Sequence, residues 1–258
     1  MIDSHCHLDF PQFDEDRDVV LRRAARAGVT AVINPGADLE SSRRAVALAG
    51  RYDAVYAAVG VHPHDASSLT DETLAELRRL ASNPEVVAIG EIGLDYYRDL
   101  SPRSRQRAAF EEQLALAAEL DLPVIIHQRD SADHVMAILR DWAKNGHPGC
   151  VLHAFSGDRE MADEAASLGF FIGIGGPLTF KNARRLPEIV PHLPLSCLLV
   201  ETDAPYLTPH PYRGKRNEPA YVVLVAERLA ELRGLPVREL SPQLVENTMR
   251  LFRRPALA

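Results

Sequence analysis

Residues 123–157 read PVIIHQRDSADHVMAILRDWAKNGHPGCVLHAFSG, and this stretch decides the fold. Two short apolar runs, Pro123–Arg129 and Cys150–Gly157, lie on either side of a helical pattern. Units of this kind recur from one end of the chain to the other, and no Gly/Ser-rich or Pro-rich linker divides them. We therefore predict one domain over residues 1–258. The predicted strands are Met1–Leu8, Val29–Gly36, Val55–Pro63, Val86–Tyr96, Pro123–Arg129, Cys150–Gly157, Phe170–Phe180 and Leu198–Leu207.

Eight strand–helix units in 258 residues predict an α/β protein built as a closed (β/α)8 barrel, or TIM barrel. The alternative is an open doubly wound sheet, but no GxGxxG turn follows any predicted strand. After the eighth strand, Ser241–Phe252 predicts an additional C-terminal helix, with Ser241 as its cap and Pro242 in its first turn. Barrel enzymes carry their chemistry at the C-terminal ends of the strands, so polar residues there are the functional candidates.

The composition limits the classes of function. A formal net charge of −7 argues against a protein that coats long nucleic acid, although cations clustered at a site can still bind a nucleic-acid end. No apolar run reaches the length of about eighteen residues that a membrane span needs. The N-terminus lacks the basic and apolar regions of a signal peptide, and the three cysteines have no CxxC spacing. We therefore expect a cytoplasmic protein.

The first and fourth predicted strands carry candidate metal ligands. In a strand, residues i and i+2 point to the same side, so the imidazoles of His5 and His7 can hold one metal ion. The alternative is a hydrogen-bonded histidine pair. Glu91 interrupts an apolar run between Gly90 and Gly93, and a buried carboxylate needs either a metal ion or a basic partner. The two glycines allow close approach of backbone or ligand, which favours a binding site.

Three further strand ends complete a set of ligands. His127 and His153 end two consecutive predicted strands at the same level. The eighth strand ends with Glu201 and Asp203, which share a face by the two-residue period, and Asp203 lies nearer the end. Because the first and eighth strands adjoin in a closed barrel, we expect Asp203 to lie close to the histidine pair. Four imidazoles and two carboxylates suffice for two divalent ions that share one bridging carboxylate.

Taken together, these motifs resemble the TatD family of metal-dependent deoxyribonucleases, within the amidohydrolase superfamily. The resemblance covers almost the whole chain, in order and without large gaps. The matching segments are residues 2–10 (IDSHCHLDF), 60–66 (GVHPHDA), 89–98 (IGEIGLDYYR), 110–131 (FEEQLALAAELDLPVIIHQRDS), 153–158 (HAFSGD), 171–183 (FIGIGGPLTFKNA), 198–209 (LLVETDAPYLTP) and 217–222 (NEPAYV).

The resemblance implies a metal site and a reaction. Glu91 takes the bridging position, where the phosphotriesterase and dihydroorotase branches of the superfamily use a carboxylated lysine. The implied cofactors are two divalent ions, Mg²⁺, Mn²⁺ or Zn²⁺, and the implied activity is 3′→5′ exonuclease action on DNA, most readily on single strands. In this hypothesis a metal-activated water cleaves the phosphodiester, and Asp203 and Glu91 are the catalytic candidates, with Asp203 as general base. The implied metal ligands are His5, His7, Glu91, His127, His153 and Asp203.

Further matches predict contacts with the substrate. His62 and His64 follow the third strand in an HPH segment, for which a turn centred on Pro63 is the alternative. Asp95 and Tyr96 follow the Glu91 strand and are expected to shape the site. Cations just beyond the strand ends are candidate phosphate contacts, although a solvated surface charge is the alternative for each. These cations are Arg98, Arg129, Lys181, Arg213, Lys215 and Arg216.

Two other functions remain open from the sequence. The same site is compatible with an ester or amide hydrolase, such as a deacylase of D-aminoacyl-tRNA, an activity found in some TatD-like proteins. A protein that binds metal or nucleic acid without catalysis is the third hypothesis, and the intact ligand set argues against it. We expect single-stranded DNA 3′ ends as the partner, with neither a membrane nor an obligate protein partner.

Overall fold

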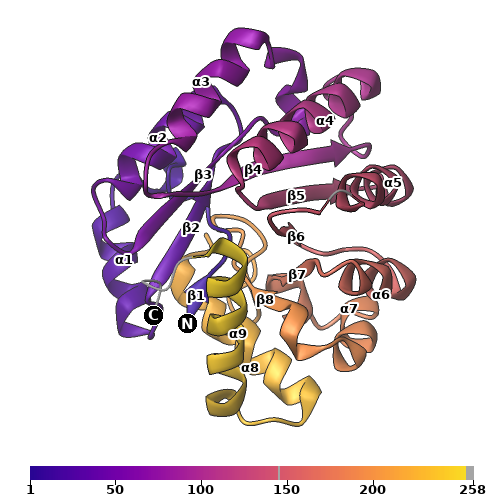
Figure 1. Cartoon of the computed structure of the whole chain (residues 1–258). Coiled ribbons are helices and arrows are strands. Elements are labelled where there is room, and N and C mark those ends of the chain that lie inside the picture. The colour runs from indigo at the N-terminus through magenta and orange to yellow at the C-terminus, as the bar shows by residue number, and fades with distance from the viewer. Residues whose placement is uncertain (145, 254–258) are drawn as a thin grey trace.

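The computed structural model describes residues 1–144 and 146–253, so residues 145 and 254–258 of the predicted 1–258 domain lie outside the described part. Eight parallel strands form one sheet in sequence order, and each strand pairs with the next (Figure 1). The strands are β1 (Ile2–Asp3), β2 (Ala31–Pro35), β3 (Val55–Val59), β4 (Val86–Asp95), β5 (Val124–Arg129), β6 (Cys150–Leu152), β7 (Phe171–Ile174) and β8 (Leu198–Val200).

The sheet closes between the segments that follow β1 and β8. Cys6 and Ala204 form a parallel bridge, and the backbone N–H of His7 donates to the carbonyl of Ala204 at 2.8 Å. In the other direction, the N–H of Asp203 donates to the carbonyl of His5 at 2.9 Å. The predicted (β/α)8 barrel is therefore confirmed, and the open sheet is excluded.

Helices follow the strands and cover the outside of the barrel (Figure 1). In the part of the chain that the structure describes, none of the helices combines the length and apolar character needed to cross a bilayer. The α-helices are α1 (Arg17–Arg26), α2 (Leu39–Ala49), α3 (Asp71–Ala81), α4 (Arg103–Leu120), α5 (Ala132–Ala143), α6 (Arg159–Ser167), α7 (Arg185–Ile189), α8 (Val222–Arg233) and α9 (Val237–Phe252). Short 3-10 helices are η1 (Pro11–Phe13), η2 (Pro63–Ser68), η3 (Gly176–Thr179), η4 (Val190–His192), η5 (Leu195–Cys197) and η6 (Pro219–Tyr221).

The additional C-terminal helix is confirmed as α9, but its predicted start was wrong. Helix α9 begins at Val237, so Pro242 lies inside the helix rather than in its first turn. The earlier start buries Leu240 in the same helix as Leu244. Ser241 does not cap the helix: its hydroxyl donates back to the carbonyl of Val237 at 2.8 Å. Burial of apolar surface thus outweighs the local Ser-Pro start signal.

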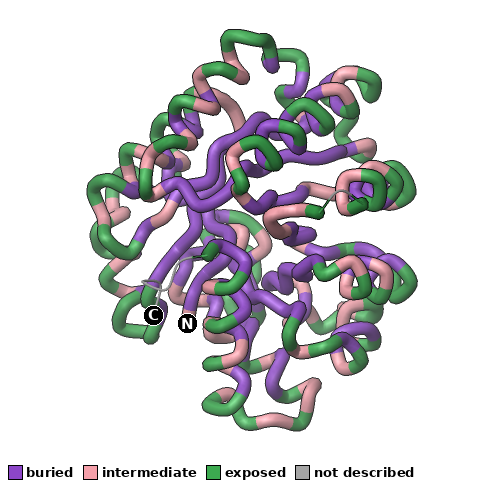
Figure 2. Tube along the Cα trace, in the orientation of Figure 1, coloured by how far each residue is buried: buried purple, intermediate pink, exposed green. Residues whose placement is uncertain are grey.

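Helix α9 closes one end of the barrel. In Figure 1 it lies beside β1 and β8, and Figure 2 shows the strands at the centre as almost continuously buried. The end of the helix contributes Leu251 and Phe252 to the cluster that fills the barrel interior. Except for Ala58, the strand residues of this cluster are among the first three of their strands, so α9 covers the N-terminal end and leaves the C-terminal end for a site. The strand residues of this cluster are Ile2, Ala31, Ile33, Ala58, Val87, Ala88, Ile125, Val151, Phe171 and Leu199.

Several predicted strands extend beyond the observed ones because the backbone turns at their C-terminal ends. Strand β8 stops at Val200, and Asp203 has a φ of 56°. Strand β6 stops at Leu152, and Ala154 has a φ of 43°. These left-handed residues end the two-residue alternation of side chains. After each strand, the direction of a side chain is therefore set by the turn and not by the strand period.

Gly93 is required by the close approach of β4 and β5. Its φ is +140°, and a Cβ atom at this position would lie 2.1 Å from the carbonyl oxygen of His127. We predict that Gly93→Ala lowers the free energy of unfolding by about 4 kcal/mol or more, because backbone must move to relieve the contact. Gly28→Ala is the matched control: its φ is +84° but the space is open, so it should cost only about 1–2 kcal/mol.

Urea unfolding of the two variants measures this difference. If Gly93→Ala and Gly28→Ala lower the free energy of unfolding by equal, small amounts, then β4 and β5 can separate without penalty. That result would contradict the close packing of these strands beneath the site.

Candidate metal centre

The structure brings all six predicted ligands together at the C-terminal end of the barrel. They come from five strands or from the turns that follow them: His5 and His7 after β1, Glu91 in β4, His127 in β5, His153 after β6 and Asp203 after β8. All six were selected from the sequence as polar residues at or near strand ends. We refer to these six residues and His62 as the metal cluster.

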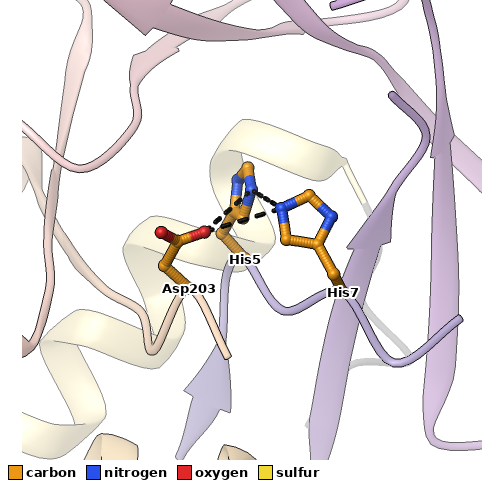
Figure 3. A group of neighbouring side chains, drawn as sticks. All are labelled: His5, His7 and Asp203. Carbon is orange, nitrogen blue, oxygen red and sulfur yellow. Dashed lines mark hydrogen bonds and ion pairs between the residues drawn. The ribbon is translucent and has the colours of Figure 1, made fainter. Parts of the chain in front are cut away.

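One part of the metal cluster is formed across the closure of the barrel. Figure 3 shows the rings of His5 and His7 and the carboxylate of Asp203 directed toward one another. The Nε2 atoms of His5 and His7 are 3.2 Å apart. The Oδ1 atom of Asp203 lies 3.5 Å from Nε2 of His7 and 3.8 Å from Nε2 of His5. The sequence expectation that barrel closure places Asp203 near the histidine pair agrees with this geometry.

Glu91 lies between two sets of imidazole nitrogens. Its carboxylate is buried, with 3% of the residue exposed. The Oε2 atom faces His5 and His7, at 3.4 and 3.7 Å from their Nε2 atoms. The Oε1 atom faces a different set of nitrogens: His127 Nδ1 at 2.8 Å, His62 Nε2 at 3.6 Å and His153 Nε2 at 3.8 Å. This is the arrangement of a carboxylate that can bridge two cations.

The spacing of these atoms fits a divalent metal ion. Ligand atoms about 2.1 Å from one cation lie roughly 3.0–3.4 Å from one another in octahedral or tetrahedral geometry. The atoms around His5 and His7 are separated by 3.2 to 3.8 Å. A mixed set of imidazole nitrogens and carboxylate oxygens suits Zn²⁺, Mn²⁺ or Fe²⁺, and it also supplies the oxygens that Mg²⁺ prefers. The residues present therefore fit the metal that the sequence predicts.

His62 lies closer to the six predicted ligands than the sequence indicated. The HPH segment was predicted to contact the substrate, and the structure places the His62 ring 4.3 Å from that of His127, centroid to centroid. His62 is also grouped with Glu91 and His127 as a set of atoms that could hold a metal ion. It is therefore a candidate ligand in addition to the six.

The ring of His64 points to another residue, Asp95. Its Nε2 atom lies 2.9 Å from Oδ2 of Asp95, which is also 3.1 Å from Nε2 of His127. The other oxygen, Oδ1, accepts the backbone N–H groups of Tyr97 and Arg98 at 3.0 and 2.8 Å. Asp95 therefore orients His127, whose Nδ1 atom remains directed at Glu91. A carboxylate behind a histidine in this way fixes its ring and its tautomer.

Glu201 has the same relation to His153, which the sequence did not reveal. The Oε1 atom of Glu201 lies 2.9 Å from Nδ1 of His153 and accepts the N–H of Ala154 at 2.5 Å. Gly173 leaves the space for it, because a Cβ atom there would lie 2.4 Å from Oε2 of Glu201. Asp203 has a left-handed φ of 56°, and the two carboxylates approach opposite nitrogens of His153: Glu201 faces Nδ1, and Oδ1 of Asp203 lies 3.6 Å from Nε2. The signal in the sequence was a carboxylate in an apolar strand end.

We predict that Glu201→Gln weakens metal binding about 10- to 100-fold, the range for residues that orient a ligand from behind. The substitution keeps the size of the side chain and removes the charge that faces Nδ1 of His153. Titration of metal-free protein with Mn²⁺ measures the effect. Glu119→Gln, at a surface carboxylate that pairs with Arg78, is the control and should bind as the wild type does. Unchanged affinity in Glu201→Gln would contradict the orienting role.

Charge in the metal cluster is shared between histidines and carboxylates. Burial opposes ionisation of Glu91, but the facing histidines, His62 foremost, hold its pKa well below the ordinary glutamate value. Burial also opposes protonation of His153, yet Glu201 and Glu91 raise its pKa to about 10. Burial lowers the pKa of His62 well below the ordinary histidine value, although the charge of Glu91 opposes this shift. A cation bound here has to displace a proton from His153, so metal affinity should rise with pH.

Two of the predicted phosphate-binding cations stack on aromatic rings. The guanidinium of Arg129 lies 3.9 Å from the ring centre of Tyr97, and that of Arg213 lies 4.0 Å from the ring centre of Phe180. Arg98 and Lys181 are exposed in the loops after β4 and β7. Lys181 lines a hollow of about 540 Å³, which Arg184 and Arg228 also line. Arg98, Arg129, Lys181 and Arg213 are exposed and lie at or beyond the C-terminal ends of β4, β5, β7 and β8, at the end of the barrel that carries the metal cluster.

Three other residues that were predicted near the substrate have contacts elsewhere in the structure. Arg216 was predicted as a cation for phosphate, but its guanidinium donates to both carboxylate oxygens of Asp16, at 2.8 and 2.7 Å. This charge therefore holds the loop after β8 to the start of α1. Lys215 lies over the ring of Tyr212 at 5.8 Å. Tyr96 lies next to Asp95. Its hydroxyl is 3.0 Å from Nδ1 of His134, a residue that is not part of the metal cluster.

Comparison with known proteins gives the family. A family model described as TatD related DNase matches residues 2–253. YabD of Bacillus subtilis, named an uncharacterized metal-dependent hydrolase, is 44% identical over 98% of this chain and 99% of its own. The 3′-5′ ssDNA/RNA exonuclease TatD of Enterobacter lignolyticus is 42% identical over 98% of each chain. The crystal structure of YjjV, a TatD homologue from Escherichia coli, matches with a TM-score of 0.93 and 39% identity over 99% of this chain and 98% of that one. The chain is a metal-dependent hydrolase and belongs to the TatD related DNase family, as its sequence motifs predicted.

Proposed function

We propose that this protein is a 3′→5′ exonuclease that removes nucleotides from single-stranded DNA, and from RNA, with the help of two divalent cations. The observation that carries the proposal is Glu91, whose two oxygens face separate sets of histidine nitrogens. A relative that is 42% identical over its whole length is named a 3′-5′ ssDNA/RNA exonuclease, which supports the choice of substrate.

The metal cluster offers two positions for a cation. One set of ligands consists of His5, His7 and Asp203 with Oε2 of Glu91. The other consists of Oε1 of Glu91 with His127, His153 and His62. When bound, Mg²⁺, Mn²⁺ or Zn²⁺ supplies a water nucleophile at neutral pH and neutralises charge on the phosphate.

The protein's own residues then position groups and move a proton. Asp203 is a carboxylate ligand that is partly open to solvent, with 15% of its side chain exposed, so it can accept the proton of an attacking water. Its pKa is lowered because the hydrogen bond from His7 and the charges of the neighbouring histidines outweigh its burial. Asp95 and Glu201 hold His127 and His153 in fixed orientations. The exposed cations of the surrounding loops are suited to contact phosphates of the strand.

A panel of substrates tests this function. Purified protein with Mg²⁺, Mn²⁺ or Zn²⁺ is given 5′-labelled single-stranded DNA, 5′-labelled RNA and a charged D-aminoacyl-tRNA. The expected result is a ladder of labelled strands that shorten from the 3′ end, absent with chelator and restored by Mn²⁺. Deacylation of the tRNA without loss of nucleotides would contradict the proposal, and so would binding of DNA without any cleavage.

A further inference from the structure

Two aromatic rings adjoin the part of the metal cluster that Figure 3 shows. Each follows a candidate ligand by three residues: Phe10 after His7, and Tyr206 after Asp203. The same backbone contact places both, since the N–H of Phe10 donates to the carbonyl of His7 at 3.2 Å and that of Tyr206 donates to the carbonyl of Asp203 at 2.9 Å. The positions of the rings are therefore tied to the positions of these two ligands.

The rings form a continuous aromatic surface that leads away from the metal cluster. Phe10 stacks on the imidazole of His7, with ring centres 4.5 Å apart and planes at 21°. Tyr206 meets Phe10 edge to face, with ring centres 6.1 Å apart. We call Phe10 and Tyr206 the aromatic pair. It starts in van der Waals contact with a candidate metal ligand and ends at the surface.

Tyr206 is not placed there to fill the protein core. It is 51% exposed, which leaves much of its ring in water. Its loop is nonetheless held firmly, because the buried side chain of Asn217 donates to the carbonyls of Tyr206 and Thr202 at 2.6 and 2.8 Å. An exposed aromatic ring on a well-anchored loop costs little entropy when it binds a ligand, and such rings are typical of binding surfaces.

We propose that the aromatic pair is a stacking site for the nucleobase of a nucleotide next to the scissile phosphate. The inference rests on the proposed nuclease function, because a phosphate held at the metal cluster puts the base of its own nucleotide within reach of this surface. Every nucleobase has a flat π face, so stacking accepts any sequence. A base paired within a duplex is stacked on its neighbours and is not free to use the surface. The aromatic pair therefore selects single-stranded ends.

Substitution of Tyr206 tests the stacking site, since Phe10 also supports His7 and its loss would disturb the metal cluster. We expect Tyr206→Ala to lower kcat/KM on single-stranded DNA by about 5- to 150-fold, the range measured when one base-stacking ring is removed. Tyr206→Phe should restore the rate to within about 3-fold of the wild type, and Tyr206→Leu should not, because leucine supplies bulk without a π face. Tyr212→Ala is the control: Tyr212 is in the same loop, but its ring is already stacked on Tyr221 at 4.7 Å.

Abasic substrates separate stacking from a structural effect. In one oligonucleotide the two nucleotides that flank the terminal phosphodiester lack bases, and the sugar–phosphate chain is otherwise unchanged. Wild type and Tyr206→Ala should cleave this strand at equal rates, because the ring has no base to contact. Metal content and the melting temperature of each variant are measured alongside.

The outcomes distinguish the stacking site from the proposed function. If wild-type protein cleaves DNA while Tyr206→Ala equals the wild type on the normal strand, the stacking site is wrong and the nuclease function stands. If Tyr206→Ala is equally impaired on normal and abasic strands, or if Tyr206→Leu restores the rate, the ring acts by packing and the inference is again overturned. If wild-type protein shortens neither DNA nor RNA, the proposed function itself fails.

Discussion

Glu91→Gln is expected to lower the rate of 3′-end hydrolysis by roughly 10³-fold, because loss of one charge from a buried, paired group costs about 3–5 kcal/mol. Glutamine keeps the volume of the side chain, so the barrel should fold. The neutral amide no longer offers two anionic oxygens to the two sets of histidines. The five surrounding imidazoles then lack the carboxylate that makes their arrangement favourable for cations.

Two measurements check this result. Elemental analysis after gel filtration should show lower metal content in Glu91→Gln than in wild type, and the remaining hydrolysis should resemble that of chelated wild type. Glu119→Gln serves as the control at a surface carboxylate. Wild-type activity and metal content in Glu91→Gln would contradict the bridging role.

Asp203→Asn is expected to lower kcat by about 10²- to 10⁴-fold, the range for loss of a general acid or base. The amide keeps an oxygen near His5 and His7, so metal binding should weaken less than in Glu91→Gln. An asparagine cannot accept the proton of the attacking water, because its carbonyl oxygen is far less basic than a carboxylate. The effect should therefore appear in kcat more than in KM.

Parallel steady-state kinetics and metal analysis separate the two roles of Asp203. Asp99→Asn, at an exposed carboxylate that pairs with Arg103, is the control and should change neither quantity. Full metal content with greatly reduced kcat supports the role as base. If Asp203→Asn loses its metal as completely as Glu91→Gln, Asp203 acts as a ligand only, and if kcat is unchanged it has neither role.

The fold could be predicted from the sequence because its signal is repeated. Each strand–helix unit carries its own apolar run. Eight such units in 258 residues favour a closed (β/α)8 barrel over other α/β folds. The six predicted ligands could be selected for a related reason. Polar residues at the ends of buried strands are costly, so Glu91 and the histidines stand out against their apolar surroundings.

What the sequence could not show depends on turns and on distant partners. Glu201 and Asp203 were predicted to share a face, but with the left-handed backbone at Asp203 their carboxylates approach opposite nitrogens of His153. Arg216 seemed to be available for phosphate until Asp16, 200 residues away, proved to hold it. Tertiary packing sets the distances between strand ends in a barrel. The HPH motif alone therefore could not predict that His62 lies beside Glu91 and His127.

Anomalous scattering from crystals soaked in Mn²⁺ tests the central claim most directly, since it locates the metal without an assumption about the substrate. The account predicts two peaks, one on each side of the Glu91 carboxylate. One lies among His5, His7 and Asp203, and the other among His127, His153 and His62. A map with no peak beside Glu91, from protein that hydrolyses nucleic acid in the same Mn²⁺ buffer, would contradict it.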